Sequence, residues 1–120
     1  MANILLVGFD RVTADQLGHL IVQDNHKFEV RSMDLANIPL TGSDVILASG
    51  DDKNCLKLLA TLRAQLSRIP FIIVNRLPET ARWLEALEAG ATDYWAAPFE
   101  RVQLRWLLDS ALMRAHRAAA

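Results

Sequence analysis

The chain has 120 residues, with 14 acidic and 13 basic side chains and a formal net charge of −1 at pH 7. This length suits one domain with its own core, and the near-neutral charge argues against a nucleic-acid-binding surface, which usually carries a basic excess. No apolar run approaches the roughly 20 residues of a membrane-spanning helix. The single cysteine, Cys55, excludes a disulfide framework and a multi-cysteine metal site. Because the first residues lack the pattern of a signal peptide, we expect a cytoplasmic protein without a membrane anchor.

Short apolar runs and amphipathic stretches alternate through the first half of the chain. The run Ile4–Val7, which ends at Gly8, is typical of a strand buried on both faces of a parallel sheet. Thr13 and Gln16 have the spacing of a capping box and predict a helix that begins there and continues to about Asn25. Two further strands are predicted over residues 28–33 and 45–48, and another amphipathic helix over residues 56–66.

The second half repeats this alternation. A third fully apolar run, residues 71–74, follows Pro70, a residue that strands tolerate at their first position. The next helix covers residues 79–89 and should end at Gly90, because glycine readily adopts the left-handed conformation that closes a helix. A short strand at residues 94–95 and a last helix from residue 101 toward the end complete the set.

This order of elements predicts an open α/β sheet with helices on both faces. The connection between the second and third strands is the exception, because only residues 34–43 are available and they include Pro39 and Gly42. We therefore expect a reduced second helix, either one turn or an irregular loop. No repeat, low-complexity segment or linker interrupts the sequence, so residues 1–120 are expected to form a single domain.

Residues 86–99 resemble a signature of the receiver domains of bacterial two-component response regulators. The family carries a run A-G-A-x-D-Y-h-x-K-P-F at the end of its fourth helix and in its fifth strand, and this chain has Ala-Gly-Ala-Thr-Asp-Tyr-Trp-Ala-Ala-Pro-Phe there. Residues 4–7, 44–49 and 69–75 resemble receiver strands one, three and four. The resemblance implies a flavodoxin-like, CheY-like three-layer sandwich with a five-stranded parallel sheet of order 2-1-3-4-5.

The resemblance also locates the family's phosphorylation site, and this sequence departs from it at every position. Receivers hold Mg²⁺ with two acidic residues after strand one, and here those positions are Gly8 and Phe9. The phospho-accepting Asp falls on Ser49, the hydroxyl residue after strand four on Asn75, and the lysine on Ala97. Without the carboxylates, Mg²⁺ loses the oxygen ligands that it prefers. We therefore predict a pseudo-receiver: a signalling module that is not an enzyme, takes no phosphoryl group, and holds no metal or cofactor.

Two alternatives use residues near the same edge of the sheet. A displaced acidic site would rely on Asp10 and Asp51 as a phosphoacceptor centre. The more ordinary interpretation is that Asp51 or Asp52 caps the helix over residues 56–66 and that Asp10 lies in the turn before the first helix. A small-ligand sensor would instead use Ser49 and Asn75 in the sheet-edge crevice. Phe9 is expected to plug that crevice, which counts against a bound anion or Mg²⁺.

An interaction surface is predicted on helix four, strand five and helix five, the surface that receivers use for dimerisation and partner docking. Trp83 lies one residue away from an expected core stripe that contains Leu84 and Leu87. Tyr94 matches the family's aromatic switch residue, and we expect either one fixed conformation or a switch driven by a partner or ligand. Trp106 and Leu107 fall outside the expected core stripe of the last helix and should be at least partly exposed, whereas Trp95 is expected in the core. That stripe consists of Leu104, Leu108, Ala111 and Leu112.

The implied partner is another protein or a second copy of the chain. In receivers the last helix often leads to an output domain, so such a domain is a possible partner as well. The three histidines have no ligand spacing to one another and predict no metal site.

Overall fold

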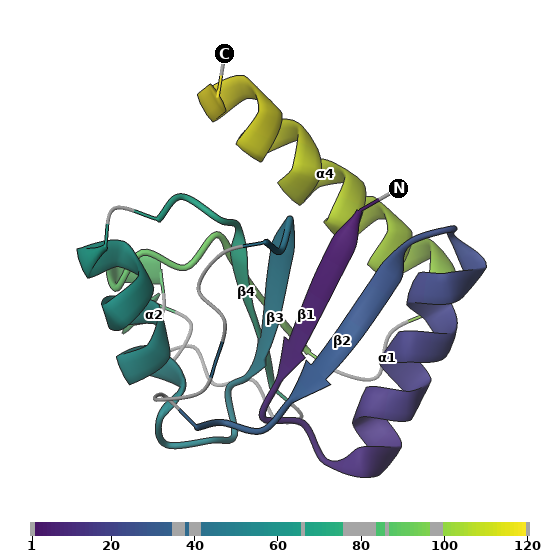
Figure 1. Cartoon of the computed structure of the whole chain (residues 1–120), viewed down its shortest axis with the longest axis horizontal. Coiled ribbons are helices and arrows are strands. Elements are labelled where there is room, and N and C mark those ends of the chain that lie inside the picture. The colour runs from purple at the N-terminus through teal and green to yellow at the C-terminus, as the bar shows by residue number, and fades with distance from the viewer. Residues whose placement is uncertain are drawn as a thin grey trace.

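The computed structural model describes residues 2–34, 38, 42–65, 67–75, 84–85, 87–96 and 100–119, and at residues 96 and 114–119 it describes the backbone alone. Its five strands are all parallel and follow the order β2-β1-β3-β4-β5. This confirms the predicted flavodoxin-like fold. Figure 1 labels the first four strands of this order. The strands are β1 (Asn3–Val7), β2 (Lys27–Arg31), β3 (Val45–Ser49), β4 (Phe71–Asn75) and β5 (Asp93–Ala96).

Helices cover both faces of the sheet (Figure 1). Apolar side chains alternate along β1, so that Ile4 and Leu6 point to one face while Leu5 and Val7 point to the other. Both sets are buried, which explains why the central strands read as continuous apolar runs. The first face is covered by α1 (Arg11–Gln23) and α4 (Arg101–Ala119), and the second by α2 (Cys55–Ala64).

Helix α1 begins two residues before the predicted start. Its N-cap is Asp10, whose carboxylate accepts a hydrogen bond from the backbone N–H of Thr13 over 2.8 Å. The prediction of Thr13 as N-cap is therefore wrong. Asp is at least as good an N-cap as Thr.

The connection between β2 and β3 contains no helix among its described residues, 32–34, 38 and 42–44, as expected from its shortness. Ile38 is buried there and joins the core on the α2 face. Within the described part of the chain, no helix combines the length and the apolar character needed to cross a membrane.

The fourth predicted helix is described only in part, at residues 84–85 and 87–88. Leu84 is 50% exposed and Leu87 is 36% exposed, so the predicted core stripe through these two residues is wrong. Apolar residues three positions apart do share one side of a helix. Their spacing does not determine whether that side faces the sheet.

Candidate functional site

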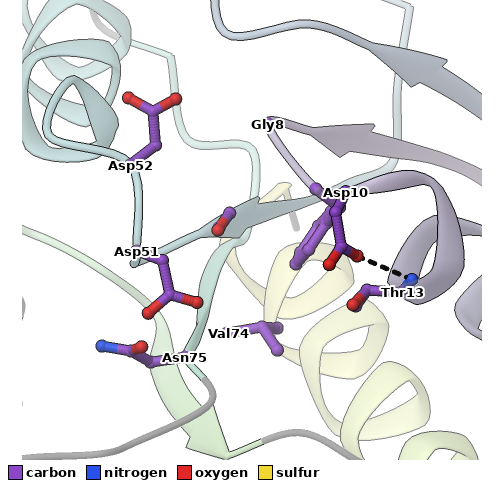
Figure 2. Close-up of a pocket in the computed structure, with 9 residues that line it drawn as sticks. Gly8, Asp10, Thr13, Asp51, Asp52, Val74 and Asn75 are labelled. Atoms are coloured by element: carbon purple, nitrogen blue, oxygen red, sulfur yellow. Dashed lines mark hydrogen bonds between the residues drawn. The ribbon is translucent and has the colours of Figure 1, made fainter.

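A pocket of about 200 Å³ lies at the carboxyl edge of the sheet, where β1, β3 and β4 end (Figure 2). Parallel strands bring their C-terminal loops to the same edge, and this is where open α/β sheets bind ligands. The structure brings together four of the five positions singled out by the resemblance, whereas Ala97 lies outside the described residues. The lining residues are Gly8, Phe9, Asp10, Thr13, Ser49, Asp51, Asp52, Val74 and Asn75.

Gly8 contributes only backbone to this pocket. Its φ angle is +80°, a conformation that residues with a side chain rarely adopt. A Cβ atom built at this position would also approach Met33 Cε within 2.9 Å. An acidic residue in this backbone conformation would be strained, which agrees with the glycine found here.

Ser49 and Asn75 are the two buried polar residues of the described core, with 6% and 2% of their surface exposed. The Asn75 side chain donates a hydrogen bond from Nδ2 to the hydroxyl oxygen of Tyr94 on β5, over 2.8 Å. Its other polar atom, Oδ1, is buried and has no hydrogen-bond partner within the described part of the chain. The link from Asn75 to Tyr94 was missed at the sequence level, although both residues had been singled out separately.

The three acidic residues of the pocket have different surroundings. Asp10 caps α1, whereas the ordinary interpretation placed it in the turn before that helix. The N-cap of α2 is Asn54, so the expected cap by Asp51 or Asp52 is wrong. Asp52 accepts a hydrogen bond from the backbone N–H of Asn54 over 2.8 Å and so shapes the turn before α2. Figure 2 shows the Asp51 carboxylate next to Asn75, whereas Asp52 points away from the other labelled side chains. The described residues include no cluster of three acidic, histidine or cysteine side chains able to hold a metal ion.

Phe9 does not fill the pocket. Its ring packs against the core on the α1 face and forms one wall of the 200 Å³ space. The predicted plug is therefore wrong, because an apolar ring is more stable against apolar neighbours than in a polar cleft.

A second pocket of about 290 Å³ adjoins the first and shares Asp51 and Asp52 with it. Tyr94 and Cys55 both line this second space. Burial, with a smaller contribution from the Asp52 carboxylate, raises the pKa of the Cys55 thiol from 9.0 to about 12. The thiol therefore stays protonated at neutral pH and is a poor nucleophile.

The structure exposes only part of the residues that were predicted to form the interaction surface. Trp106 on α4 is 58% exposed, as expected, and its ring packs at a tilt of 58° against Trp95, with the ring centroids 5.8 Å apart. Leu107 is only 1% exposed, so its predicted place on the surface is wrong. It lies three residues after Leu104 and belongs to the same buried stripe, which is wider than the sequence suggested. Trp83 lies outside the described residues.

The comparisons with known proteins find response regulators at low sequence identity. The chain is 27% identical, over 113 residues, to the response regulator protein FleR of Pseudomonas aeruginosa, a match that covers 90% of this chain and 23% of FleR. No family model matches the chain. The chain spans about a quarter of the length of its curated relative FleR.

Solved structures show the same fold. The Francisella response regulator 1452 receiver domain superposes with a TM-score of 0.81 at 24% identity, covering 95% of this chain and 98% of that one. NtrX from Brucella abortus superposes with a TM-score of 0.87 at 18% identity, covering 98% of this chain and 29% of that one. At these sequence identities the structural matches establish the fold of the chain.

Proposed function

We propose that this response regulator receiver domain, of the CheY-like type, is a non-catalytic signalling module that works without phosphorylation. Its degenerate positions Gly8, Ser49 and Asn75 support the proposal, because together they offer no carboxylate where receivers carry their Mg²⁺ ligands and phosphoacceptor. The longer chains of FleR and NtrX favour an output domain as one partner of the module. A cytoplasmic location and the absence of direct nucleic-acid contact are parts of the same proposal.

The observation that carries this proposal is the hydrogen bond from Asn75 to Tyr94. The resemblance places a hydroxyl residue at position 75 and an aromatic switch residue at position 94. Here the amide Nδ2 of Asn75 donates a hydrogen bond to the hydroxyl oxygen of Tyr94 over 2.8 Å, and only 2% of the surface of Asn75 is exposed. Such a bond contributes about 1 kcal/mol and more when its loss leaves a buried donor unpaired. Tyr94 is thereby tied to the sheet edge without a phosphoryl group.

The signal would then leave through a protein contact on the outer side of α4. Trp106 is the large aromatic anchor of this surface, at 58% exposure. Val102 lies four residues earlier and Met113 seven residues later, so the three share one side of the helix, and all three are exposed. Exposed tryptophan flanked by aliphatic side chains is typical of the centre of a protein interface. We include a second copy of the chain among the partners.

An amide NMR titration with Mg²⁺ followed by beryllofluoride, which mimics an aspartyl phosphate, tests phosphorylation independence. We expect no saturable shifts at Gly8, Ser49 or Asn75. The intact mass after incubation with acetyl phosphate and Mg²⁺ should likewise show no added phosphoryl group. Saturable shifts that reach Tyr94, together with a phosphoryl mass that disappears in Asp51→Asn, would instead establish the displaced acidic site of Asp10 and Asp51.

A second function, small-ligand sensing, is favoured by the open pocket beside Phe9. The pocket has room for a ligand of a few heavy atoms, and Asn75, whose buried Oδ1 has no hydrogen-bond partner among the described residues, is part of its lining. Because this oxygen belongs to the residue that holds Tyr94, a ligand here would act on the residue that the resemblance identifies as the switch.

A further inference from the structure

We propose that the outer edge of β2 binds β2 of a second copy of the chain, antiparallel and with Val30 facing Val30, so that the two sheets become one continuous sheet. This surface goes beyond the proposed function. It lies at the edge of the sheet opposite to β5, the strand on which Trp95 contacts Trp106. It depends neither on the absence of phosphorylation nor on a contact through α4.

The backbone of β2 offers hydrogen-bonding groups on its outer side. β2 is the first strand in the order of the sheet (Figure 1), and among the described strands it pairs with β1 alone. The N–H of Lys27 donates to Ala2 O over 2.9 Å, and the N–H of Gly8 donates to Arg31 O over 3.0 Å, so residues 27 and 31 direct their backbone groups toward β1. Successive residues of a strand alternate in this direction, and those of residues 28 and 30 therefore point outward. Such an edge is a template for another strand.

The side chains along this edge are accessible to a partner. All five residues of β2 are exposed, including the apolar Phe28 and Val30, at 39% and 47%. The ring of Phe28 lies over Gly18 of α1, and Val30, two residues later, lies on the same face of the sheet. Pairing about Val30 places the two valines opposite each other and removes their apolar surface from water.

The charges of β2 match those of a second copy in this register. Charged side chains usually protect an edge strand from pairing, but here their signs alternate along Lys27, Glu29 and Arg31. Antiparallel pairing about Val30 places Glu29 of each copy opposite Arg31 of the other, whereas pairing about Glu29 brings two carboxylates together. Glu29 and Arg31 already form an ion pair along the strand and are both about half exposed. Because their backbone groups face β1, they become non-hydrogen-bonded pairs, in which side chains of antiparallel strands come closest.

A register about Phe28 also matches charges, because Lys27 then lies opposite Glu29. It places residue 30 opposite His26, whose N–H already donates to Ile21 O over 3.2 Å and is not available to a second strand. Pairing about residue 30 instead places Phe28 opposite residue 32, which directly follows β2. The backbone therefore favours the register about residue 30.

The test is sedimentation equilibrium of the full chain carrying Trp106→Ala, which removes the association proposed for α4. We expect a reversible equilibrium between monomer and dimer. Glu29→Arg and Arg31→Glu each bring like charges together at two places, because every contact of a two-fold dimer occurs twice. Each should weaken dimerisation by about tenfold. The chain with both changes regains opposite charges and should return to within about threefold of the starting affinity.

A one-to-one mixture of the two single variants separates pairing from any general effect of charge. The Glu29→Arg chain is positive at positions 29 and 31, and the Arg31→Glu chain is negative at both, so a mixed pair matches at both places. The mixture should dimerise about tenfold more tightly than either variant alone. Lys27→Glu is the matched control: it changes the net charge as Arg31→Glu does, but its position lies opposite Met33 and should alter affinity by less than about threefold.

Four results overturn the proposal: a monomer at every concentration, a dimer unaffected by either single change, a mixture no tighter than its components, or equal losses in Lys27→Glu and Arg31→Glu. The last would indicate pairing about Phe28. A single variant that failed to fold would not dimerise in the mixture either, and the far-ultraviolet circular dichroism of each chain reports its folding. None of these results bears on phosphorylation independence, which the acetyl phosphate mass measurement decides.

Discussion

The ring of Phe28 on β2 lies directly over Gly18 of α1, so that a Cβ atom built on Gly18 would come within 2.5 Å of Phe28 Cζ. Glycine inside a helix lowers its stability by about 1 kcal/mol relative to alanine. The close approach explains why glycine is nevertheless found here. Because Phe28 is 39% exposed, its ring can swing outward if that space is filled.

We therefore expect Gly18→Ala to act differently in two backgrounds. In Phe28→Ala, where the ring is absent, the substitution should stabilise the protein by about 1 kcal/mol through helix propensity. In the natural background the gain should be cancelled by the displaced ring. Urea unfolding of the four proteins measures the coupling as a double-mutant cycle, and an equal effect of Gly18→Ala in both backgrounds contradicts it.

Arg63 at the end of α2 donates hydrogen bonds to three backbone carbonyls in two other segments of the chain. Its Nε and Nη2 donate to Gly90 O, and its Nη1 donates to Ser67 O and Ile69 O, over 2.9 to 3.1 Å. Partial burial of the guanidinium lowers the pKa of Arg63. Arg63→Met keeps the aliphatic stem and removes every donor, so we expect a loss of about 1–3 kcal/mol of unfolding free energy.

Arg63→Lys keeps the charge but cannot reach three carbonyls with one ammonium group, and it should recover less than half of that loss. The exposed Arg105→Met provides a control for the removal of charge. If Arg63→Met and Arg105→Met lower the midpoint of thermal unfolding equally, the carbonyl contacts are not what stabilises this region.

Cys55 makes stability depend on pH in the alkaline range. Its pKa of about 12 in the folded chain lies above the ordinary value of 9.0. Between these values the unfolded thiol loses its proton while the folded thiol keeps it, so the free energy of unfolding falls as pH rises. Below pH 9 the contribution vanishes. The slope within this window is about 1.4 kcal/mol per pH unit for one fully shifted group.

Cys55→Ala should remove that part of the pH dependence. Denaturant unfolding of both proteins between about pH 8 and pH 11 gives the comparison. Groups that titrate in both proteins, such as the lysines, cancel in the difference. Rapid reaction of the folded natural protein with a thiol reagent at neutral pH would contradict the burial on which the prediction depends.

Trp106 is the residue whose loss should most affect association through α4. Trp106→Ala removes an exposed ring that touches Trp95 and should cost the fold about 1 kcal/mol or less. We expect it to weaken self-association by about tenfold or more, measured by sedimentation over a range of concentrations. Val22→Ala, an exposed aliphatic change on α1, is the matched control. Identical mass distributions for Trp106→Ala and the natural chain exclude this residue from the interface.

The order of the strands could be predicted because the central strands are buried on both faces. Continuous apolar runs such as residues 45–48 and 71–74, when helices separate them along the chain, are typical of strands in a parallel sheet that is covered on both faces. β2 has every residue exposed and still pairs with β1, which its own pattern indicated only weakly. Parallel pairing then brought Gly8, Ser49 and Asn75 to one edge, because the ends of parallel strands meet there.

The wrong predictions share one cause. The spacing of residues along the chain does not specify which other part of the chain packs against them. The capping-box spacing of Thr13 and Gln16 is present in the sequence, but Asp10, three residues before the predicted start, caps the helix instead. Leu107 was assigned to the wrong side because α4 packs on both the sheet and α1, which widens its buried stripe. The Asn75–Tyr94 bond depends on the register between β4 and β5, a quantity that no short pattern encodes.

Helix α4 has 19 residues and is therefore about 28 Å long, against about 16 Å for a five-residue strand. Figure 1 shows its C-terminal part extending past the sheet. Its buried residues, from Leu104 to Ala111, lock the first turns to the core, while the rest continues as one uninterrupted helix. Each added or deleted residue beyond Ala111 rotates the far end by about 100° and shifts it by about 1.5 Å. The number of residues after Ala111 therefore determines the direction in which the C-terminal end of the helix points.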